Sequence, residues 1–200
     1  MSVKSMSVTH ITNKMLADKK PFDGSEMKKE LQALLKDGVL VAHNAKFDIG
    51  ILKAEGIEVP RYICTLRIAR HLDENSVIPE YNLQFLRYYL DLEIDGNAHD
   101  AECDVKTLCA IFDRQFSKIK ESFKEEKESE EKAIQKMLEI SSKPTLFKKF
   151  NFGKYKDQKI SDVLLSDRGY LEWMLGEKSK TPDPEEDWIF TLQSYLKPHP

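Results

Sequence analysis

The sequence has little cysteine and no long apolar run. Its three cysteines, Cys64, Cys103 and Cys109, form no CxxC pair and have no histidine at ligand spacing. This pattern argues against both a disulfide framework and a structural zinc site, and we expect three small buried residues instead. No segment approaches the roughly 20 apolar residues of a membrane helix, and the first ten residues lack the apolar core of a signal peptide. We therefore expect a cytoplasmic protein without a membrane partner.

An excess of positive charge is also missing. The chain has 31 Lys and Arg against 34 Asp and Glu, a formal net charge of -3. Any nucleic-acid binding would therefore depend on a local basic patch rather than on overall charge. Hydrophobic residues make up 40% and charged residues 32% of the 200 positions. These values suit a globular chain of one medium domain, or one domain with a small addition.

Apolar periodicity predicts helices that alternate with short strands over the first half of the chain. An apolar run after an Asp-Gly turn indicates a strand buried on both faces, and the following segment has helical spacing with Phe47, Ile51 and Leu52 as its inner face. Alternation of this kind favours a sheet covered by helices, an α/β fold. The predicted helices are 28–35, 45–54, 66–72 and 82–90, and the predicted strands are 39–42 and 62–66.

From Asp100 the periodicity predicts one long helix that continues towards Ile140. Its middle, Lys124–Lys132, is charged all round, which is typical of a solvated helical connector. The SSKPT stretch then breaks the chain. We therefore predict a first domain over 1–118, a charged helical linker over 119–144 and a small C-terminal domain over 145–200.

Two short polar segments stand at the ends of apolar elements. The first, HNAKFD, runs from His43 to Asp48 and places an acid inside the helix that follows the buried strand. An ordinary helix-start acid is the alternative interpretation. In the second, HDAECD, His99 and Asp104 can converge only if His99 lies in the loop and Asp104 one turn inside the helix.

Together the two segments resemble the second and third motifs of the DEDDh 3'-5' exonucleases, the superfamily that includes the bacterial proofreading subunit. The HIT segment at His10 and the ICTLRIAR stretch resemble further landmarks of that family, and the tail from Phe150 resembles the C-terminal domain of exonuclease X-like proteins. The resemblance spans essentially the whole chain. It implies an RNase H-like exonuclease domain followed by a small α+β C-terminal domain.

The resemblance also implies the chemistry. Two divalent cations, Mg²⁺ or Mn²⁺, held by carboxylates would activate a water and stabilise the leaving oxygen, and hard oxygen ligands suit both ions. Asp48 and Asp104 would be metal ligands, and His99 would take the proton of the water. His43 and Asn44 are expected in structural or substrate-positioning roles. The substrate would be DNA, as single-stranded 3' ends, with mononucleotides as product.

The first motif of that family, Asp-x-Glu-Thr on the first strand, is absent from these residues. Nine residues precede His10 and contain no acid, and the acids that follow lie in a Lys/Pro-rich stretch without a buried strand. The expectation is therefore an exonuclease domain that lacks its first strands, as an incomplete gene product rather than a degenerate relative. Two acids supply charge -2 against +4 for two metals, so a two-metal site from these residues alone is improbable.

The tail combines lysines with aromatic residues. Six lysines and one Asp lie between Lys143 and Lys159, interleaved with aromatic side chains. Lysines neutralise phosphates and aromatic faces stack on unpaired bases, so Lys154, Tyr155 and Lys156 are candidate contacts, with Lys148 on the same surface. The alternative is a small hairpin whose phenylalanines form its own core. Alternation places Phe150 and Phe152 inside that hairpin, and Trp173 and Trp188 are expected in the core.

Two functions remain open at this point. The first is a metal-dependent 3'-5' exodeoxyribonuclease. The second is a non-catalytic relative that binds single-stranded nucleic acid or a protein partner through its basic aromatic tail.

Overall fold

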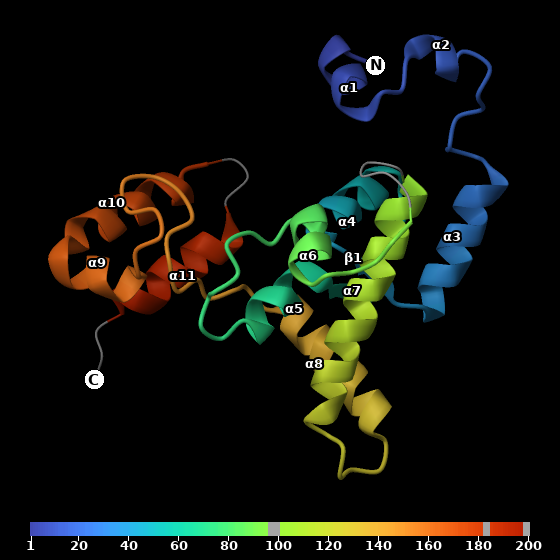
Figure 1. Cartoon of the computed structure of the whole chain (residues 1–200). Coiled ribbons are helices and arrows are strands. Elements are labelled where there is room, and N and C mark those ends of the chain that lie inside the picture. The colour runs from blue at the N-terminus through green and yellow to red at the C-terminus, as the bar shows by residue number, and fades with distance from the viewer. Residues whose placement is uncertain (96–100, 182–184, 198–200) are drawn as a thin grey trace.

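The computed structural model describes residues 1–95, 101–181 and 185–197. Its helices form an N-terminal arm, a central unit around a small sheet, and a C-terminal unit (Figure 1). The arm contains α1 (Val3–Thr9) and α2 (Asn13–Leu16). The central unit contains α3 (Glu26–Asp37), β1 (Leu40–Ala42), α4 (Ala45–Ala54), β2 (Tyr62–Cys64), α5 (Thr65–Leu72), α6 (Leu83–Tyr89), α7 (Ala101–Glu121) and α8 (Ser129–Ser142). The C-terminal unit contains α9 (Ile160–Ser166), α10 (Arg168–Ser179) and α11 (Glu186–Leu196).

The predicted alternation of helices and strands is confirmed in the central unit. β1 and β2 pair in parallel, with Leu40 opposite Tyr62 and Ala42 opposite Cys64. Parallel pairing follows from the crossover through α4 between the two strands. In the part of the chain that the structure describes, these two strands are the whole sheet, so β1 pairs along one edge only. Ala42 and Cys64 are buried at the sheet end where the HNAKFD segment begins.

The N-terminal arm lies apart from the sheet in Figure 1, and no described side chain of residues 1–20 is buried. Local capping explains why it is helical nevertheless. The Ser2 side chain accepts a hydrogen bond from the Ser5 backbone N–H, and the Thr12 side chain accepts one from the Met15 N–H. The HIT segment therefore lies outside the packed core.

Helix α8 corrects the predicted linker. The long helix is interrupted after Glu121, and α8 packs back against α7, α5 and β2. Ala133 and Met137 are fully buried in the same cluster as Ile63 and Ile68. Residues 133–140 thus belong to the core of the central unit. Their apolar side chains follow the charged run in the sequence and recur at helical spacing on one face of α8. The charged run Lys124–Lys132 is largely exposed, as predicted, but the predicted linker over 119–144 is wrong for residues 133–140.

Helix α4 has the predicted bounds, but its predicted inner face is wrong in two places. Phe47 is 67% and Ile51 51% exposed, whereas Ala45 is fully buried and Ile49 packs beside it. The helix therefore turns Ala45 and Ile49 to the sheet. Among the cysteines, Cys64 and Cys103 are buried as expected, whereas Cys109 is exposed.

The C-terminal unit closes around one core of three helices. Phe150, Leu171, Trp188 and Leu192 are among its buried residues. In place of the predicted hairpin, the described residues form only two isolated bridges, Lys149 with Lys159 and Phe150 with Lys156. Phe150 and Trp188 are buried as predicted.

The predictions for Phe152 and Trp173 were wrong, since both are exposed. Gly153, with φ of +72°, reverses the chain directly after Phe152, so the strand alternation on which that prediction depended does not continue. No described helix is long and apolar enough to cross a membrane.

Candidate active site

The HNAKFD segment forms the turn between β1 and α4. Asn44 adopts a left-handed backbone with φ of +70°, a conformation that asparagine tolerates better than most residues. Its carbonyl accepts a hydrogen bond from the Phe47 N–H at 2.9 Å, which starts the helix. The Asn44 side chain makes no capping hydrogen bond and is exposed. It is therefore available to a ligand at the end of the sheet.

His43 is held by both ring nitrogens. Nε2 lies 2.6 Å from the Tyr81 carbonyl oxygen, and Nδ1 lies 2.9 Å from the Thr65 hydroxyl. Because a carbonyl can only accept, Nε2 carries the hydrogen and Nδ1 accepts from Thr65. Burial lowers the pKa of His43, against the opposing effect of the Tyr81 hydrogen bond, and Arg70 lowers it further. His43 is thus a neutral side chain that ties the loop at Tyr81 to the sheet, with no ring nitrogen left for a substrate.

Asp48 lies in the first turn of α4 and is half-buried. Its carboxylate has no cationic or hydrogen-bonding side-chain partner in the described part of the chain. Burial raises the pKa of Asp48, and only its own backbone N–H opposes that effect. A partly desolvated carboxylate without a partner is what a bound cation would stabilise.

Asp104 lies in the first turn of α7 and is also half-buried. Its Oδ1 accepts a hydrogen bond from the Gln84 side-chain amide of α6. The Gln84 Oε1 is buried and has no partner in the described structure. Gln84 therefore orients the Asp104 carboxylate, whose second oxygen has no hydrogen-bond partner among the described residues. His99, the predicted proton acceptor, lies outside the described residues.

The described acids do not complete a metal centre. Within residues 1–95, 101–181 and 185–197, no group of three His, Cys, Asp or Glu side chains could hold a metal ion. Asp48 and Asp104 supply two carboxylates, fewer than a two-metal site needs to balance its charge. The donor set of these residues therefore does not fit a two-metal centre by itself.

A cleft of about 930 Å³ adjoins this site and is shared by the central and C-terminal units. Its central wall includes His43, Asn44 and the loop before α6, and its C-terminal wall includes residues 145–151 and Lys156. Asn44 and Lys156 thus line one cleft although 112 positions separate them in the sequence.

The other two tail candidates have partners within the C-terminal unit. The Lys154 ammonium lies 3.3 Å from an Asp167 carboxylate oxygen and 4.6 Å from the centre of the Tyr155 ring. The Tyr155 hydroxyl donates to the same carboxylate, and its ring packs edge-on against Tyr170. Neither residue lines the cleft, so of the three only Lys156 shares the cleft with Asn44.

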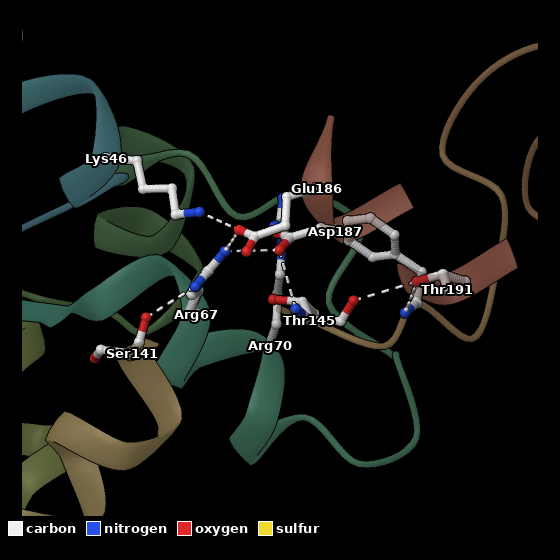
Figure 2. A network of polar contacts seen from close by, with 9 residues as sticks. Lys46, Arg67, Arg70, Ser141, Thr145, Glu186, Asp187 and Thr191 are labelled. Carbon is white, nitrogen blue, oxygen red and sulfur yellow. Dashed lines mark hydrogen bonds and ion pairs between the residues drawn. The ribbon is translucent and has the colours of Figure 1, made fainter. Parts of the chain in front are cut away.

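A network of charged side chains joins the two units beside the cleft (Figure 2). Asp187 of α11 accepts hydrogen bonds from Arg67 at 2.8 Å, from Arg70 at 3.2 Å and from the Thr145 N–H at 3.0 Å. Arg67 is 6% exposed and also donates to the Ser141 carbonyl. Glu186 bonds Arg67 and Lys46, the lysine of the HNAKFD segment. We call this network the interdomain latch.

The sequence contained a partial signal for the latch. Two arginines three positions apart on an otherwise apolar helix, Arg67 and Arg70, require an anionic partner when the helix is buried. The partner, Asp187, is 120 and 117 positions away, so local pattern could not find it.

Comparison with known proteins agrees with this architecture. The model of the family described as "Exonuclease" matches residues 1–112, which is more than half of the chain, and the "Exodeoxyribonuclease X-like C-terminal" model matches residues 150–179. The chain belongs to the exonuclease family. Both parts of the resemblance stated from the sequence are thereby confirmed.

Individual relatives extend the match. The chain is 27% identical to exodeoxyribonuclease 10 of Escherichia coli K12 over 209 aligned positions, which cover 98% of this chain and 80% of the relative. It is 39% identical to the PolC-type DNA polymerase III of Streptococcus pyogenes over 54% of this chain, but this region is only 8% of that polymerase. No solved structure matches the chain significantly.

Proposed function

We propose that this exonuclease acts on DNA and removes mononucleotides from single-stranded 3' ends in a divalent-metal-dependent reaction. Asp48 and Asp104 are the proposed ligands for Mg²⁺ or Mn²⁺, and His99 is the proposed proton acceptor. Asn44 and Lys156 contact the substrate, and His43 positions the loop that borders it. The relatives, an exodeoxyribonuclease and DNA polymerases, support DNA as the substrate.

The observation that carries this proposal is the state of Asp48. Its carboxylate is partly desolvated, has a raised pKa and has no side-chain partner among the described residues, and it lies in the first turn of the helix that follows β1, in a segment that resembles a family motif. A carboxylate that serves only as a helix-start acid would lose little by being fully solvated. Asp104, with one oxygen held by Gln84, is the second ligand of suitable chemistry. Hard carboxylate oxygens suit Mg²⁺ and Mn²⁺.

Metal binding and nuclease activity test the proposal separately. Titration of the full chain with Mn²⁺, followed by electron paramagnetic resonance, is expected to show binding that Asp48→Asn and Asp104→Asn each weaken by about tenfold or more. Asp113→Asn, an exposed acid on the same helix as Asp104, is the matched control and should bind Mn²⁺ as the unaltered chain does. Equal binding by all three variants contradicts the ligand assignment.

For activity, release of mononucleotides from a labelled single-stranded oligonucleotide is measured with Mg²⁺ and with EDTA. The expected product comes from the 3' end, requires Mg²⁺, and is lost in Asp48→Asn but not in Asp113→Asn. Release that continues in EDTA, or that persists in Asp48→Asn, would exclude this mechanism.

A non-catalytic nucleic-acid-binding role is the second candidate. The absence of a three-ligand cluster among the described residues favours it, as does the interdomain cleft with Lys156 on its wall. On this hypothesis binding to single-stranded DNA persists in EDTA, and no mononucleotide appears under any metal condition. Persistent binding together with Mg²⁺-dependent release favours the enzyme instead.

A further inference from the structure

The two walls of the interdomain cleft differ in charge. The C-terminal wall presents Lys148, Lys149 and Lys156 against one acid, Asp157. The Lys149 ammonium lies 3.0 Å from the Ser76 carbonyl, and Lys148 donates to the Glu74 carbonyl. Among the described residues, none of the three lysines forms a salt bridge with a carboxylate, although Lys149 interacts electrostatically with Asp73 of the opposite wall. The C-terminal wall therefore carries positive charge that is only partly balanced across the cleft.

The opposite wall carries two acids, Asp73 and Glu80, and both carboxylates are held by hydrogen bonds. Asp73 lines the cleft, but its carboxylate accepts hydrogen bonds from the Val77 and Ile78 N–H groups and from the Tyr81 hydroxyl. Burial opposes its ionisation, yet these hydrogen bonds and the charge of Lys149 outweigh burial and hold the pKa of Asp73 below its usual value. Asp73 therefore keeps its negative charge, which folds the loop and interacts with Lys149. Glu80 is the other acid of this wall, and its carboxylate accepts from the Asn82 side chain.

The cleft is also fixed in shape by the interdomain latch. Asp187 binds Arg67 and Arg70 of the central unit and the Thr145 N–H, where the lysine-bearing wall begins. The Thr191 hydroxyl of α11 accepts a hydrogen bond from the Phe147 N–H at 3.0 Å. The Arg70 guanidinium lies 4.9 Å from the centre of the Phe147 ring. Figure 2 shows Arg67 and Arg70 of the central unit meeting Asp187 of the C-terminal unit. The two walls are therefore held together before a ligand arrives, which lowers the cost of binding.

Asn44 lines the cleft and lies four residues before Asp48 in the sequence. We propose that the DNA strand leading to the 3' terminal nucleotide runs through this cleft. Its phosphates would contact Lys149 and Lys156, and Asn44 would contact the strand at the boundary with the candidate active site. Lys148 would add a third phosphate contact. This inference rests on the proposed function for its substrate, and it makes the C-terminal unit a fixed part of the substrate path rather than a tethered module.

Charge removal within the cleft tests the inference. The variant Lys149→Gln/Lys156→Glu keeps a donor for the Ser76 carbonyl and removes two of the three positive charges of the wall. Lys180→Glu, an exposed lysine of the C-terminal unit outside the cleft, is the control. Binding is measured by fluorescence anisotropy of the full chain with labelled oligothymidylates in EDTA. The probes are about 3 and about 20 nucleotides long, below and above the range that single-strand-binding sites commonly span.

The cleft variant is expected to bind the long oligonucleotide about tenfold more weakly, whereas the control changes less than about twofold. Loss of two phosphate contacts lowers the magnitude of the slope of log K against log salt by about 1.4. Unchanged affinity and slope overturn the inference, as does a failure of the unaltered chain to bind. Lys156→Glu alone, with circular dichroism melts of each variant, separates lost contacts from lost folding.

Nuclease assays distinguish the failure of this inference from failure of the proposed function. If the function is right and the cleft is not the path, mononucleotide release from the long oligonucleotide has the same KM in the cleft variant and the control. If the cleft is the path but the function is wrong, the binding difference persists and no variant releases mononucleotides. If both are right, KM for the long oligonucleotide rises in the cleft variant, while cleavage of the short one is unaffected.

Discussion

The C-terminal and central units use their apolar residues differently. The C-terminal unit buries Phe150, Leu171 and Trp188 in one continuous cluster. The central unit divides its buried residues among three clusters in the described structure, and large side chains such as Phe47 and Ile51 remain exposed. A short chain segment thus forms one core, whereas the longer unit divides its core among several clusters. Both units leave large apolar side chains exposed, such as Phe47 in the central unit and Trp173 in the C-terminal unit.

The difference predicts where substitutions should be most damaging. Trp188→Ala is expected to lower the free energy of unfolding by about 4 kcal/mol, because Trp188 is 3% exposed and stacks on Phe150 at 5.5 Å. Trp173→Ala, whose side chain is 60% exposed, is the matched control and should cost under about 1 kcal/mol. Urea unfolding of both variants measures the difference. Equal costs would mean that the C-terminal core does not depend on Trp188.

A second substitution tests whether α8 belongs to the central core. Met137→Ala is expected to cost about 3 kcal/mol, because Met137 is fully buried in the cluster that contains Ile63 and Ile68. Glu131→Ala, an exposed position on the same helix, should stay within about 0.5 kcal/mol of the unaltered chain. A negligible effect of Met137→Ala would restore the solvated-connector interpretation.

The case of α8 shows how far the sequence could predict this fold. Helix α4 and both strands lie where apolar periodicity placed them, because each is a local pattern beside a clear turn. Before and at the start of α8, the run of charges predicts a solvated segment, whereas the helical spacing of Ala133, Met137 and Ile140 indicates a buried face. Phe47 and Ile51 fit an inner face by periodicity alone, but the available packing surface decided which side of α4 was buried.

The site shows the same limit. Asp48 and Asp104 could be chosen from local motifs, whereas the cleft shared by Asn44 and Lys156 depends on contacts between distant segments. Arg67 and Arg70 were visible as charges on an apolar helix, but their partner Asp187 was not. Local pattern thus predicts the residues of one element, and tertiary packing decides which elements face each other.

The interdomain latch connects the two contrasted units and yields a third prediction. Asp187→Asn is expected to cost about 2 kcal/mol, because Arg67 and Arg70 lose their shared charged acceptor while they stay largely buried. Glu177→Gln, whose salt bridge with Lys180 is exposed, should cost under about 0.5 kcal/mol. Calorimetry is expected to show the unfolding of the two units becoming separate in Asp187→Asn. A single sharp transition, unchanged in both variants, would show that the latch does not couple them.

The smallest expected effect concerns the exposed face of α4. Ile51→Ser is expected to change the free energy of unfolding by less than about 0.5 kcal/mol, because Ile51 is 51% exposed and belongs to no buried cluster of the described residues. Ile49→Ser, two positions earlier, should cost about 2 kcal/mol, since Ile49 packs against Ala42, Ala45 and Cys64. Urea unfolding of the pair measures which side of α4 faces the sheet. A larger loss of unfolding free energy for Ile51→Ser than for Ile49→Ser would show that the opposite side of α4 faces the sheet.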